Sequence, residues 1–314
     1  MSRIHEALKK AEQERAGRVL APLDPKAPEP ADPGTAAEEN LLSTAGGEVL
    51  GSSGRAGEDA LAQLTQEALK GQVRKFKWNP NPQTMLFFGQ EAYAPGTEEF
   101  RTLRSHLYAF RDLEPVRTVL VTSAAPREGK SFIVANLAQI CVQQPGRRVL
   151  LVDADLRWSR LHLTLGTPAT PGLSDYLAGE ASELSILQRG PLENLYFIPG
   201  GKHSSNPAEL IANGRLKDLI RRLSPLFDWV FIDSPPVMAV SDSRVIADFC
   251  DGLLLVVGAA MQPYDFVQKT CLQFKGKRLL GVVLNRAEAR ASYGYKYYGY
   301  YRGPDGDGDG KPKG

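Results

Sequence analysis

From residue 77 onward, short apolar runs alternate with stretches of helical periodicity, and this alternation constrains the fold more than any other feature. Strands that are apolar on both faces belong to a parallel sheet covered by helices on each side. We therefore predict an α/β fold, a mostly parallel sheet flanked by helices. The predicted strands are residues 118–122, 148–152, 195–198, 229–232, 253–257 and 279–284, and the predicted helices are residues 97–110, 130–143, 207–223, 242–249 and 264–274.

Composition divides the chain into four parts. Residues 1–16 have one apolar face at helical spacing and predict a short helix. Residues 17–76 are rich in Pro, Ala, Gly, Ser and Glu, and such a segment buries too little apolar area to offset the entropy of ordering it. We predict a disordered linker there, with a possible helix near residues 59–69. Residues 77–290 form the predicted folded domain, and residues 291–314 form a tyrosine-rich tail that we also expect to be disordered.

Charge and cysteine content exclude several classes of function. The formal net charge is +2, so the sequence gives no reason to expect a nucleic-acid partner. Three scattered cysteines fit neither a disulfide framework nor a metal site, and the four histidines lack the spacing of metal ligands. The apolar runs are shorter than the roughly 20 residues of a membrane span. We expect a cytoplasmic protein that reaches a membrane only through a partner.

Residues 124–131 (AAPREGKS), between a predicted strand and a predicted helix, have the pattern of a phosphate-binding loop. Backbone N–H groups of such a loop surround a β-phosphate, and the helix N-terminus adds positive potential. Lys130 is expected to reach the β- and γ-phosphates, and Ser131 to bind Mg²⁺. Ala124 departs from the general pattern, which has Gly there, and a chance loop is the alternative. The predicted nucleotide-binding residues of the loop are Ala125, Pro126, Arg127, Glu128, Gly129, Lys130, Ser131 and Phe132.

Three aspartates follow predicted strands. Asp153 and Asp155 come after the strand at residues 148–152, and Asp233 ends the strand at residues 229–232. Carboxyl ends of parallel strands meet at one rim, where carboxylates can hold a metal or accept a proton. Asp153 is the candidate base, and Asp155 and Asp233 join Ser131 as metal ligands. The choice between Asp153 and Asp155 is a hypothesis, and helix capping is the alternative for Asp233.

Six of the eleven tyrosines crowd into nine residues near the C-terminus. Glycines and a lysine separate them, whereas a core uses tyrosines singly among apolar neighbours. A neutral phenol, with a pKa of about 10, needs a base before it can attack a phosphate. An aromatic strip that stacks on nucleic-acid bases is the alternative. The predicted phosphate acceptors are Tyr293, Tyr295, Tyr297, Tyr298, Tyr300 and Tyr301.

Four features of the sequence together resemble one family. They are the phosphate loop, the DADLR motif at residues 153–157, the IDSP motif at residues 232–235 and the tyrosine cluster. This family is the bacterial tyrosine kinases of exopolysaccharide and capsule synthesis, relatives of the MinD/ParA ATPases with a P-loop fold. The resemblance extends over about residues 91–301. It implies ATP and Mg²⁺ as cofactors, autophosphorylation of the tyrosine cluster, and an adenine-facing role for Asn285. Arg157 either stabilises transferred phosphate or forms a surface ion pair.

The same resemblance gives a role to an ExxRxxR pattern formed by Glu98, Arg101 and Arg104 on a predicted helix. In the family this helix contacts the next subunit of a ring, which delivers the tyrosines of one subunit to the ATP site of its neighbour. An ordinary salt-bridged surface helix is the alternative. We expect a ring-shaped homo-oligomer when the chain is unphosphorylated.

The family's two layouts differ in their membrane partner. In one, the kinase is fused to a membrane-spanning chain-length regulator, and in the other it is a separate protein that the regulator's cytoplasmic tail activates. This chain resembles the second layout. Its expected partners are the membrane regulator, further copies of the chain and a cognate tyrosine phosphatase. We expect no nucleic-acid partner. The expected location is the inner face of the plasma membrane.

Two other functions fit part of the pattern. A MinD/ParA-type positioning ATPase shares the fold and the aspartates, but it usually carries an extra lysine early in the loop, where this chain has Ala124, Ala125 and Pro126. Water would then be the acceptor and the tyrosines would have no role. A non-enzymatic scaffold that binds nucleotide is the second alternative. Label from γ-labelled ATP on the protein would indicate a kinase, and release of phosphate alone an ATPase.

Overall fold

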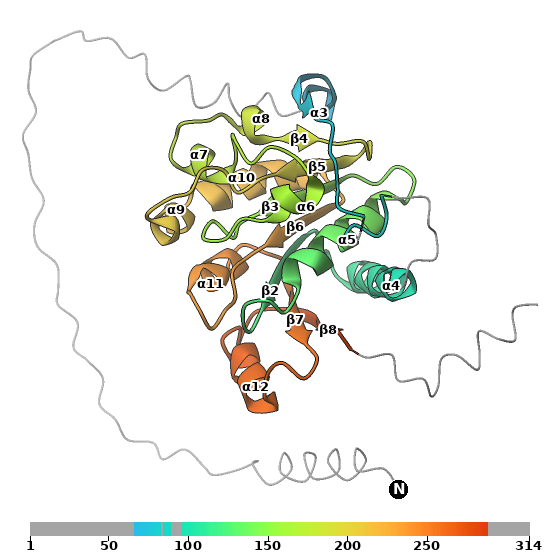
Figure 1. The fold of residues 1–314 in the computed structure, drawn as a ribbon, viewed down its shortest axis with the longest axis vertical. Helices are drawn as coiled ribbons and strands as arrows, with labels where there is room; N and C mark the ends of the chain where they lie inside the picture. Colours follow the sequence, from blue (N-terminus) through green and yellow to red (C-terminus); the bar gives the residue numbers. More distant parts are fainter. Residues whose placement is uncertain (1–65, 83, 89–95, 288–314) are drawn as a thin grey trace, which may run out of the picture. The chain divides into compact units, whose positions relative to one another are not determined.

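The structure, a computed structural model, describes residues 66–82, 84–88 and 96–287 (Figure 1). The predicted N-terminal helix, most of the predicted linker and the tyrosine-rich segment therefore lie outside the described residues. Among the described residues, no helix combines the length and apolar character needed to cross a membrane.

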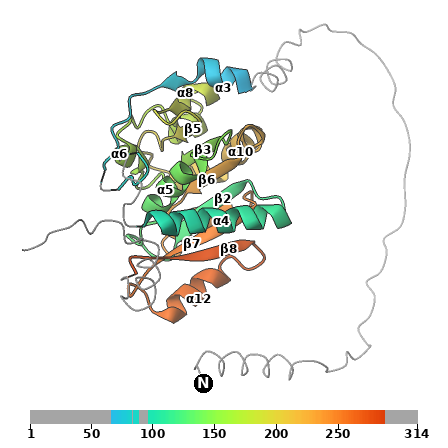
Figure 2. The same ribbon diagram turned by 90° about the vertical axis from the view of Figure 1, so that its right-hand side faces the viewer.

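An eight-stranded sheet forms the centre of the described region. Its strands are β1 (Arg74–Lys75), β2 (Thr118–Ser123), β3 (Val149–Asp153), β4 (Gln188–Arg189), β5 (Leu195–Ile198), β6 (Trp229–Asp233), β7 (Gly252–Gly258) and β8 (Leu279–Asn285). They lie in the order β1-β4-β5-β3-β6-β2-β7-β8, which Figure 2 shows as a stack from β8 to β5. Every pairing is parallel except β4 with β5, so the predicted fold class is confirmed.

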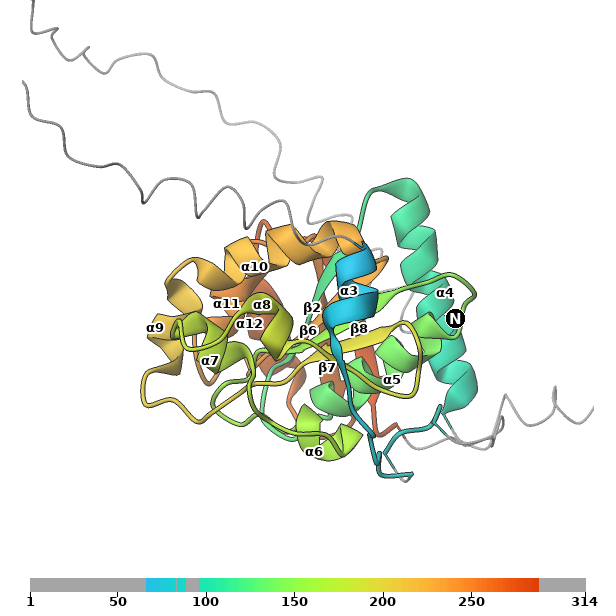
Figure 3. The ribbon, with the colours of Figure 1, turned by 90° about the horizontal axis from the view of Figure 1, so that it is seen from above.

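Helices cover both faces of the sheet, as two-sided apolar strands require. The helices are α3 (Gln66–Gln72), α4 (Thr97–Leu113), α5 (Lys130–Val142), α6 (Leu161–Leu165), α7 (Leu173–Leu177), α8 (Glu183–Ile186), α9 (Pro207–Ala212), α10 (Arg215–Leu223), the 3₁₀ helix η1 (Ser224–Leu226), α11 (Asp242–Ala247) and α12 (Tyr264–Leu272). Figure 3 shows α4 and α5 on one side of the sheet and α10 and α11 on the other.

Each central strand divides its side chains between the two layers. In β2, Val119 and Val121 pack in the cluster of α4 and α5, whereas Leu120 packs in the cluster of α10 and α11. All three side chains are completely buried. Because the strands are buried on both faces, only their ends reach solvent, and polar groups at those ends are confined to the sheet's two rims.

The end of the predicted linker, where a helix was possible near residues 59–69, contains ordered elements. Helix α3 and strand β1 lie within residues 66–75, and Leu69 and Val73 are 1% and 4% exposed in the core cluster of α10. Two well-placed apolar side chains anchor a segment whose average composition is that of a linker. Strand β1 then adds to the sheet edge by pairing with β4.

The helix predicted over residues 207–223 is two helices. Helix α9 ends at Ala212 and α10 begins at Arg215, because Gly214 between them has a φ of 83°. This left-handed conformation is accessible to glycine and breaks the helical hydrogen-bond ladder. The amphipathic pattern continues across the break, which explains why periodicity alone does not reveal it.

Candidate active site

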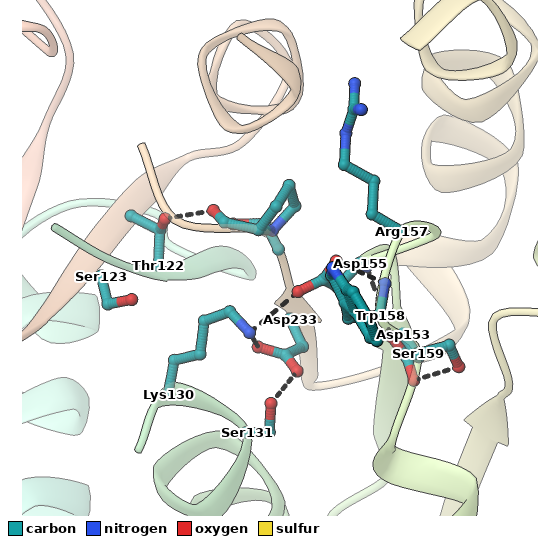
Figure 4. Close-up of polar contacts among 12 residues, drawn as sticks. Thr122, Ser123, Lys130, Ser131, Asp153, Asp155, Arg157, Trp158, Ser159 and Asp233 are labelled. Carbon is teal, nitrogen blue, oxygen red and sulfur yellow. Dashed lines mark hydrogen bonds and ion pairs between the residues drawn. The ribbon is translucent and has the colours of Figure 1, made fainter. Parts of the chain in front are cut away.

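Three central strands end in polar residues at one rim of the sheet. Strand β2 leads into the loop of residues 124–129, which continues directly into α5. Asp153 at the end of β3 pairs in register with Asp233 at the end of β6. The parallel register therefore places the two aspartates beside each other and next to the N-terminus of α5 (Figure 4). Asp233 does not cap a helix, since α11 begins at Asp242.

The loop before α5 is held in shape by buried contacts. The Glu128 carboxylate is fully buried and accepts hydrogen bonds from the Ala125 N–H (2.7 Å) and the Gly258 N–H (3.3 Å). Asn285 Nδ2 donates to the Glu128 carbonyl oxygen (2.9 Å). Gly129 has a φ of 94°, and a Cβ atom there would lie 2.0 Å from Asn285 Nδ2. The loop thus depends on glycine at this position and on support from the ends of β7 and β8.

Lys130 and Ser131, the first residues of α5, face the aspartates. Lys130 Nζ donates to Asp155 Oδ2 at 3.0 Å and lies 4.0 Å from Asp233 Oδ1. Ser131 Oγ donates to Asp233 Oδ2 at 2.6 Å. The structure therefore brings together the lysine, the serine and the carboxylates that the sequence singles out.

Asp153 and Asp155 differ in their surroundings. Asp153 Oδ2 accepts hydrogen bonds from Ser159 Oγ (2.7 Å) and the Leu161 N–H (3.1 Å). From the part of the chain that the structure describes, Asp153 Oδ1 accepts only a longer bond, donated by the Asp155 N–H (3.3 Å). Asp155 instead directs one oxygen to Lys130 and accepts the Trp158 N–H with the other (3.1 Å).

The pKa values of these groups follow from burial and crowding. Burial and the neighbouring carboxylate of Asp233 raise the pKa of Asp153. Burial likewise raises the pKa of Asp233, although Lys130 and Ser131 oppose the shift. Burial disfavours the Lys130 ammonium, but Asp233 and Asp155 outweigh burial and the pKa of Lys130 is raised. One buried cation thus stands among three carboxylates, which leaves the site with excess negative charge when all are ionised.

This crowding predicts a pH-dependent stability difference. Because the pKa of Asp153 is higher in the folded chain than in the unfolded one, the folded state binds more protons. The free energy of unfolding then falls as the pH rises through the raised pKa of Asp153. We expect Asp153→Asn, which keeps an oxygen for Ser159, to raise the melting temperature of the nucleotide-free protein more at pH 8 than at pH 5. Each kcal/mol corresponds to about 2–4 °C in a domain of this size.

The measurement is thermal unfolding of both proteins across this pH range, without Mg²⁺. Asp265→Asn, which removes an exposed carboxylate from α12, is the matched control and should give a constant difference. A difference between Asp153→Asn and the unsubstituted protein that stays constant or shrinks towards pH 8 contradicts the interpretation.

Other predicted residues have contacts away from the carboxylates. The Phe132 ring packs against Phe100 of α4, with centroids 5.9 Å apart. Pro126 and Arg127 are exposed at the loop tip, where Arg127 has a φ of 67°. Arg157 forms an ion pair with the buried Asp242 at the start of α11 (Nε to Oδ2, 2.9 Å), which corresponds to the structural alternative for this arginine.

The ExxRxxR residues divide between surface and interior. Glu98 and Arg101 are exposed and form an ion pair with each other. Arg104 instead donates to the Ile140 carbonyl oxygen near the end of α5 (3.0 Å) and so holds α4 against α5. Their contact with a neighbouring subunit stays a prediction, and the six tyrosines lie outside the described residues.

The site contains residues that sequence reasoning did not single out. Ser159 and the Leu161 N–H fix the side chain of Asp153. The predicted contact of Glu128 with the nucleotide rests on its place in the loop motif, and its carboxylate has a further, structural role because it accepts backbone N–H groups of the protein itself. A fully buried glutamate in a loop has no distinctive sequence signal.

The loop before α5 needs a glycine, and its lysine and serine face aspartates at the rim of a parallel sheet. This arrangement is that of a P-loop nucleotide-binding fold. No protein-family model matches the chain. It is 35% identical over 212 residues to Tyrosine-protein kinase CpsD of Streptococcus agalactiae, and the match covers 66% of this chain and 91% of that protein. The chain therefore belongs to the bacterial tyrosine-protein kinase family.

Two further similarities agree with this assignment. Tyrosine-protein kinase wzc of Salmonella typhimurium is 35% identical over 206 residues, covering 65% of this chain and 28% of that protein. The chain thus matches little more than a quarter of the longer relative's length. The kinase domain of the Escherichia coli tyrosine kinase ETK has a TM-score of 0.57 and 30% sequence identity, covering 63% of this chain and 80% of that one.

Proposed function

We propose that this chain is an ATP-dependent protein-tyrosine kinase that phosphorylates its own C-terminal tyrosine cluster. The observation that carries the proposal is the convergence of Lys130, Ser131 and Asp233 at the rim, with Lys130 Nζ 3.0 Å from Asp155. Such a site positions a nucleoside triphosphate and needs only an acceptor for the phosphate. The six clustered tyrosines are the proposed acceptors, and membership of the tyrosine-kinase family supports this choice.

The residues of the site fit a magnesium ion. Asp233 Oδ1 is buried without a hydrogen-bond partner among the described residues, while Asp233 Oδ2 and Ser131 Oγ lie 2.6 Å apart. In the part of the chain that the structure describes, no group of three or more His, Cys, Asp or Glu side chains could form a metal cage. This agrees with Mg²⁺, which in phosphoryl-transfer sites takes most of its ligands from phosphates and water. Ser131, Asp233 and Asp155 would hold the ion. When bound, it would neutralise charge on the phosphates.

The remaining side chains have separate roles in this proposal. Lys130 leaves Asp155 to bind the phosphates, whose negative charge is greater than that of one carboxylate. Asp153 is the base: its raised pKa suits proton uptake near neutral pH, and its Oδ1 accepts a single long hydrogen bond from the described residues. Asn285 supports the loop next to the place we propose for the adenine. The loop N–H groups and the α5 N-terminus complete the phosphate site.

We extend the proposal to the cell by resemblance to the family. The chain would phosphorylate its tyrosines in trans within a ring, and so regulate exopolysaccharide or capsule synthesis and export. A membrane chain-length regulator would activate it at the inner face of the plasma membrane, and a cognate tyrosine phosphatase would reverse the reaction. The exposed Glu98–Arg101 pair supports a charged subunit contact on α4.

The direct test is incubation of the full chain with Mg²⁺ and γ-labelled ATP, with and without a co-expressed membrane regulator. We expect label on the protein, located by mass spectrometry in residues 291–314. Release of labelled phosphate while the tyrosines stay unmodified would instead assign a positioning ATPase. Binding of ATP without turnover in either condition would assign a nucleotide-dependent scaffold.

Phosphorylation is also expected to change the assembly. Each phosphotyrosine adds about −1.5 to −2 charges. Several on one short segment would repel each other and the rim of Asp153, Asp155 and Asp233. We therefore expect the unphosphorylated chain to be oligomeric and the heavily phosphorylated chain to be monomeric in multi-angle light scattering. A phosphorylated oligomer of unchanged mass contradicts this expectation.

A further inference from the structure

A cavity lies at the opposite rim of the sheet from the phosphate loop. It has a volume of about 650 Å³ and is formed by the end of α4, the start of β2, helix α10 and the segment before β7. Thr118, the first residue of β2, lines it, whereas the phosphate loop follows the last residue of the same strand. Six strand residues span about 20 Å. This cavity is therefore separate from the proposed ATP site.

Positive charge predominates in this cavity. Four cationic side chains line it, and among its lining residues Asp251 is the single carboxylate. Asp251 Oδ2 already accepts the N–H groups of Arg117 and Thr118, both at 2.8 Å. Lys217 has no ion-pair partner among the described residues, so its charge is available to a ligand. The four cations are Arg111, Arg117, Lys217 and Arg221, of which Arg221 forms an ion pair with Asp218 on the same helix (3.2 Å).

Two of the arginines are held in place while keeping unused donors. Arg111 Nη1 donates to the Asp228 carbonyl oxygen (2.9 Å), and its guanidinium stacks over Trp229 at 5.3 Å from the ring centroid. Asp228 Oδ1 also lies 3.9 Å from Arg111 Nη2. Arg117 Nη1 donates to the Ser224 carbonyl oxygen at 3.3 Å. A guanidinium has five N–H donors, so each arginine can still bind an oxyanion.

The accessible apolar lining of the cavity comes mainly from the half-buried ring of Phe249, behind which Val116 and Ile220 are almost completely buried. An apolar surface beside arginines and a lysine matches a ligand that joins a ring to a phosphate dianion. Phosphotyrosine has this composition, and clusters of arginine are a recurrent means of binding it.

We propose that this cavity binds phosphotyrosine from the C-terminal segment, residues 291–314, of the same chain. The proposal rests on the proposed kinase function, which generates that ligand. Chain length permits it: Tyr301 is 14 residues beyond Ala287, the last described residue, and that many residues reach up to about 46 Å. Binding there would keep a phosphorylated segment away from the ATP site and its aspartates.

A synthetic peptide tests this inference independently of kinase activity. The host is the full chain with its six clustered tyrosines replaced by phenylalanine, which cannot be phosphorylated there, with saturating Mg²⁺ and ADP to occupy the ATP site. The probe is a fluorescein-labelled peptide of residues 291–304, with or without phosphate on Tyr297 and Tyr298, followed by fluorescence anisotropy at 150 mM salt. We expect the phosphorylated peptide to bind at least 10-fold more tightly than the unphosphorylated one.

The control compares charge reversals at two exposed helical lysines. Lys217→Glu in the cavity should weaken binding of the phosphorylated peptide at least 10-fold, and Lys269→Glu on α12 less than 2-fold. Equal binding of both peptides, or equal effects of the two variants, overturns the inference. Displacement of the peptide by an equal concentration of inorganic phosphate also overturns it and assigns a small-anion site. If the chain phosphorylates its tyrosines but gives these negative results, the proposed kinase function stands and only the proposed phosphotyrosine site is rejected.

Discussion

Replacing Lys130 by methionine is expected to reduce autophosphorylation at least 100-fold. The ammonium of Lys130 lies 3.0 Å from Asp155 and 4.0 Å from Asp233 in a largely buried site. Without it, the triphosphate would approach three carboxylates with one positive charge fewer to offset them. Removing one preorganised donor that stabilises transition-state charge lowers rates by about 10²–10³-fold in other enzymes. The measurement is the initial rate of label transfer from γ-labelled ATP.

Lys269→Met provides the matched control, because it removes an exposed lysine from α12 with the same change of side chain. It should leave the rate within about twofold. Melting temperatures of both variants show whether Lys130→Met is still folded, since that variant leaves the rim carboxylates without their cation. A folded Lys130→Met protein that keeps more than a tenth of the rate would exclude the proposed role of the lysine.

Much of the site could be predicted from sequence because most of its residues lie at or just after the carboxyl ends of strands. A buried parallel strand exposes its carboxyl end at a known rim, so an aspartate that follows an apolar run must lie there. The register pairs Asp153 with Asp233, which agrees with the prediction that these carboxylates lie close together. The same reasoning places Lys130 and Ser131, because the loop leads straight from β2 into α5.

The contacts that fix these side chains could not be predicted in the same way. The bonds of Glu128 to Gly258 and of Asn285 to Glu128 join positions more than 100 residues apart. They depend on how β7 and β8 lie against the loop, and no local pattern encodes that. The resemblance implies an adenine-facing role for Asn285, which stays a prediction, and it gave no sign that the Asn285 amide supports the loop backbone next to Gly129.

Composition also failed where a few side chains outweigh the average. Helix α3 belongs to a segment with the composition of a linker, yet Leu69 is almost completely buried against the core. Arg104 lies in a pattern that suggests a uniform charged face, yet its guanidinium bonds to the backbone of α5. In both cases a single tertiary contact decides the structure, and it is visible only once the partner element is in place.

Replacing all six clustered tyrosines by phenylalanine is expected to reduce incorporation of label into the chain at least 10-fold. Phenylalanine keeps the aromatic rings but lacks the hydroxyl that accepts the phosphate. The ATP site is unchanged in this variant, so nucleotide binding should stay within about twofold of the original. The measurement is label per chain after incubation with Mg²⁺ and γ-labelled ATP, together with nucleotide affinity. The substituted residues are Tyr293, Tyr295, Tyr297, Tyr298, Tyr300 and Tyr301.

Tyr264→Phe is the control that separates exposure from sequence context. Tyr264 begins α12 and is 77% exposed, so its hydroxyl is accessible without belonging to the cluster. If accessibility alone selected the acceptor, this variant would lose label and the six-fold variant would keep part of it. We expect Tyr264→Phe to match the unsubstituted chain.

Mixing the six-fold variant with Lys130→Met then tests transfer between subunits, since label on the Lys130→Met chain can come only from a neighbour's ATP site.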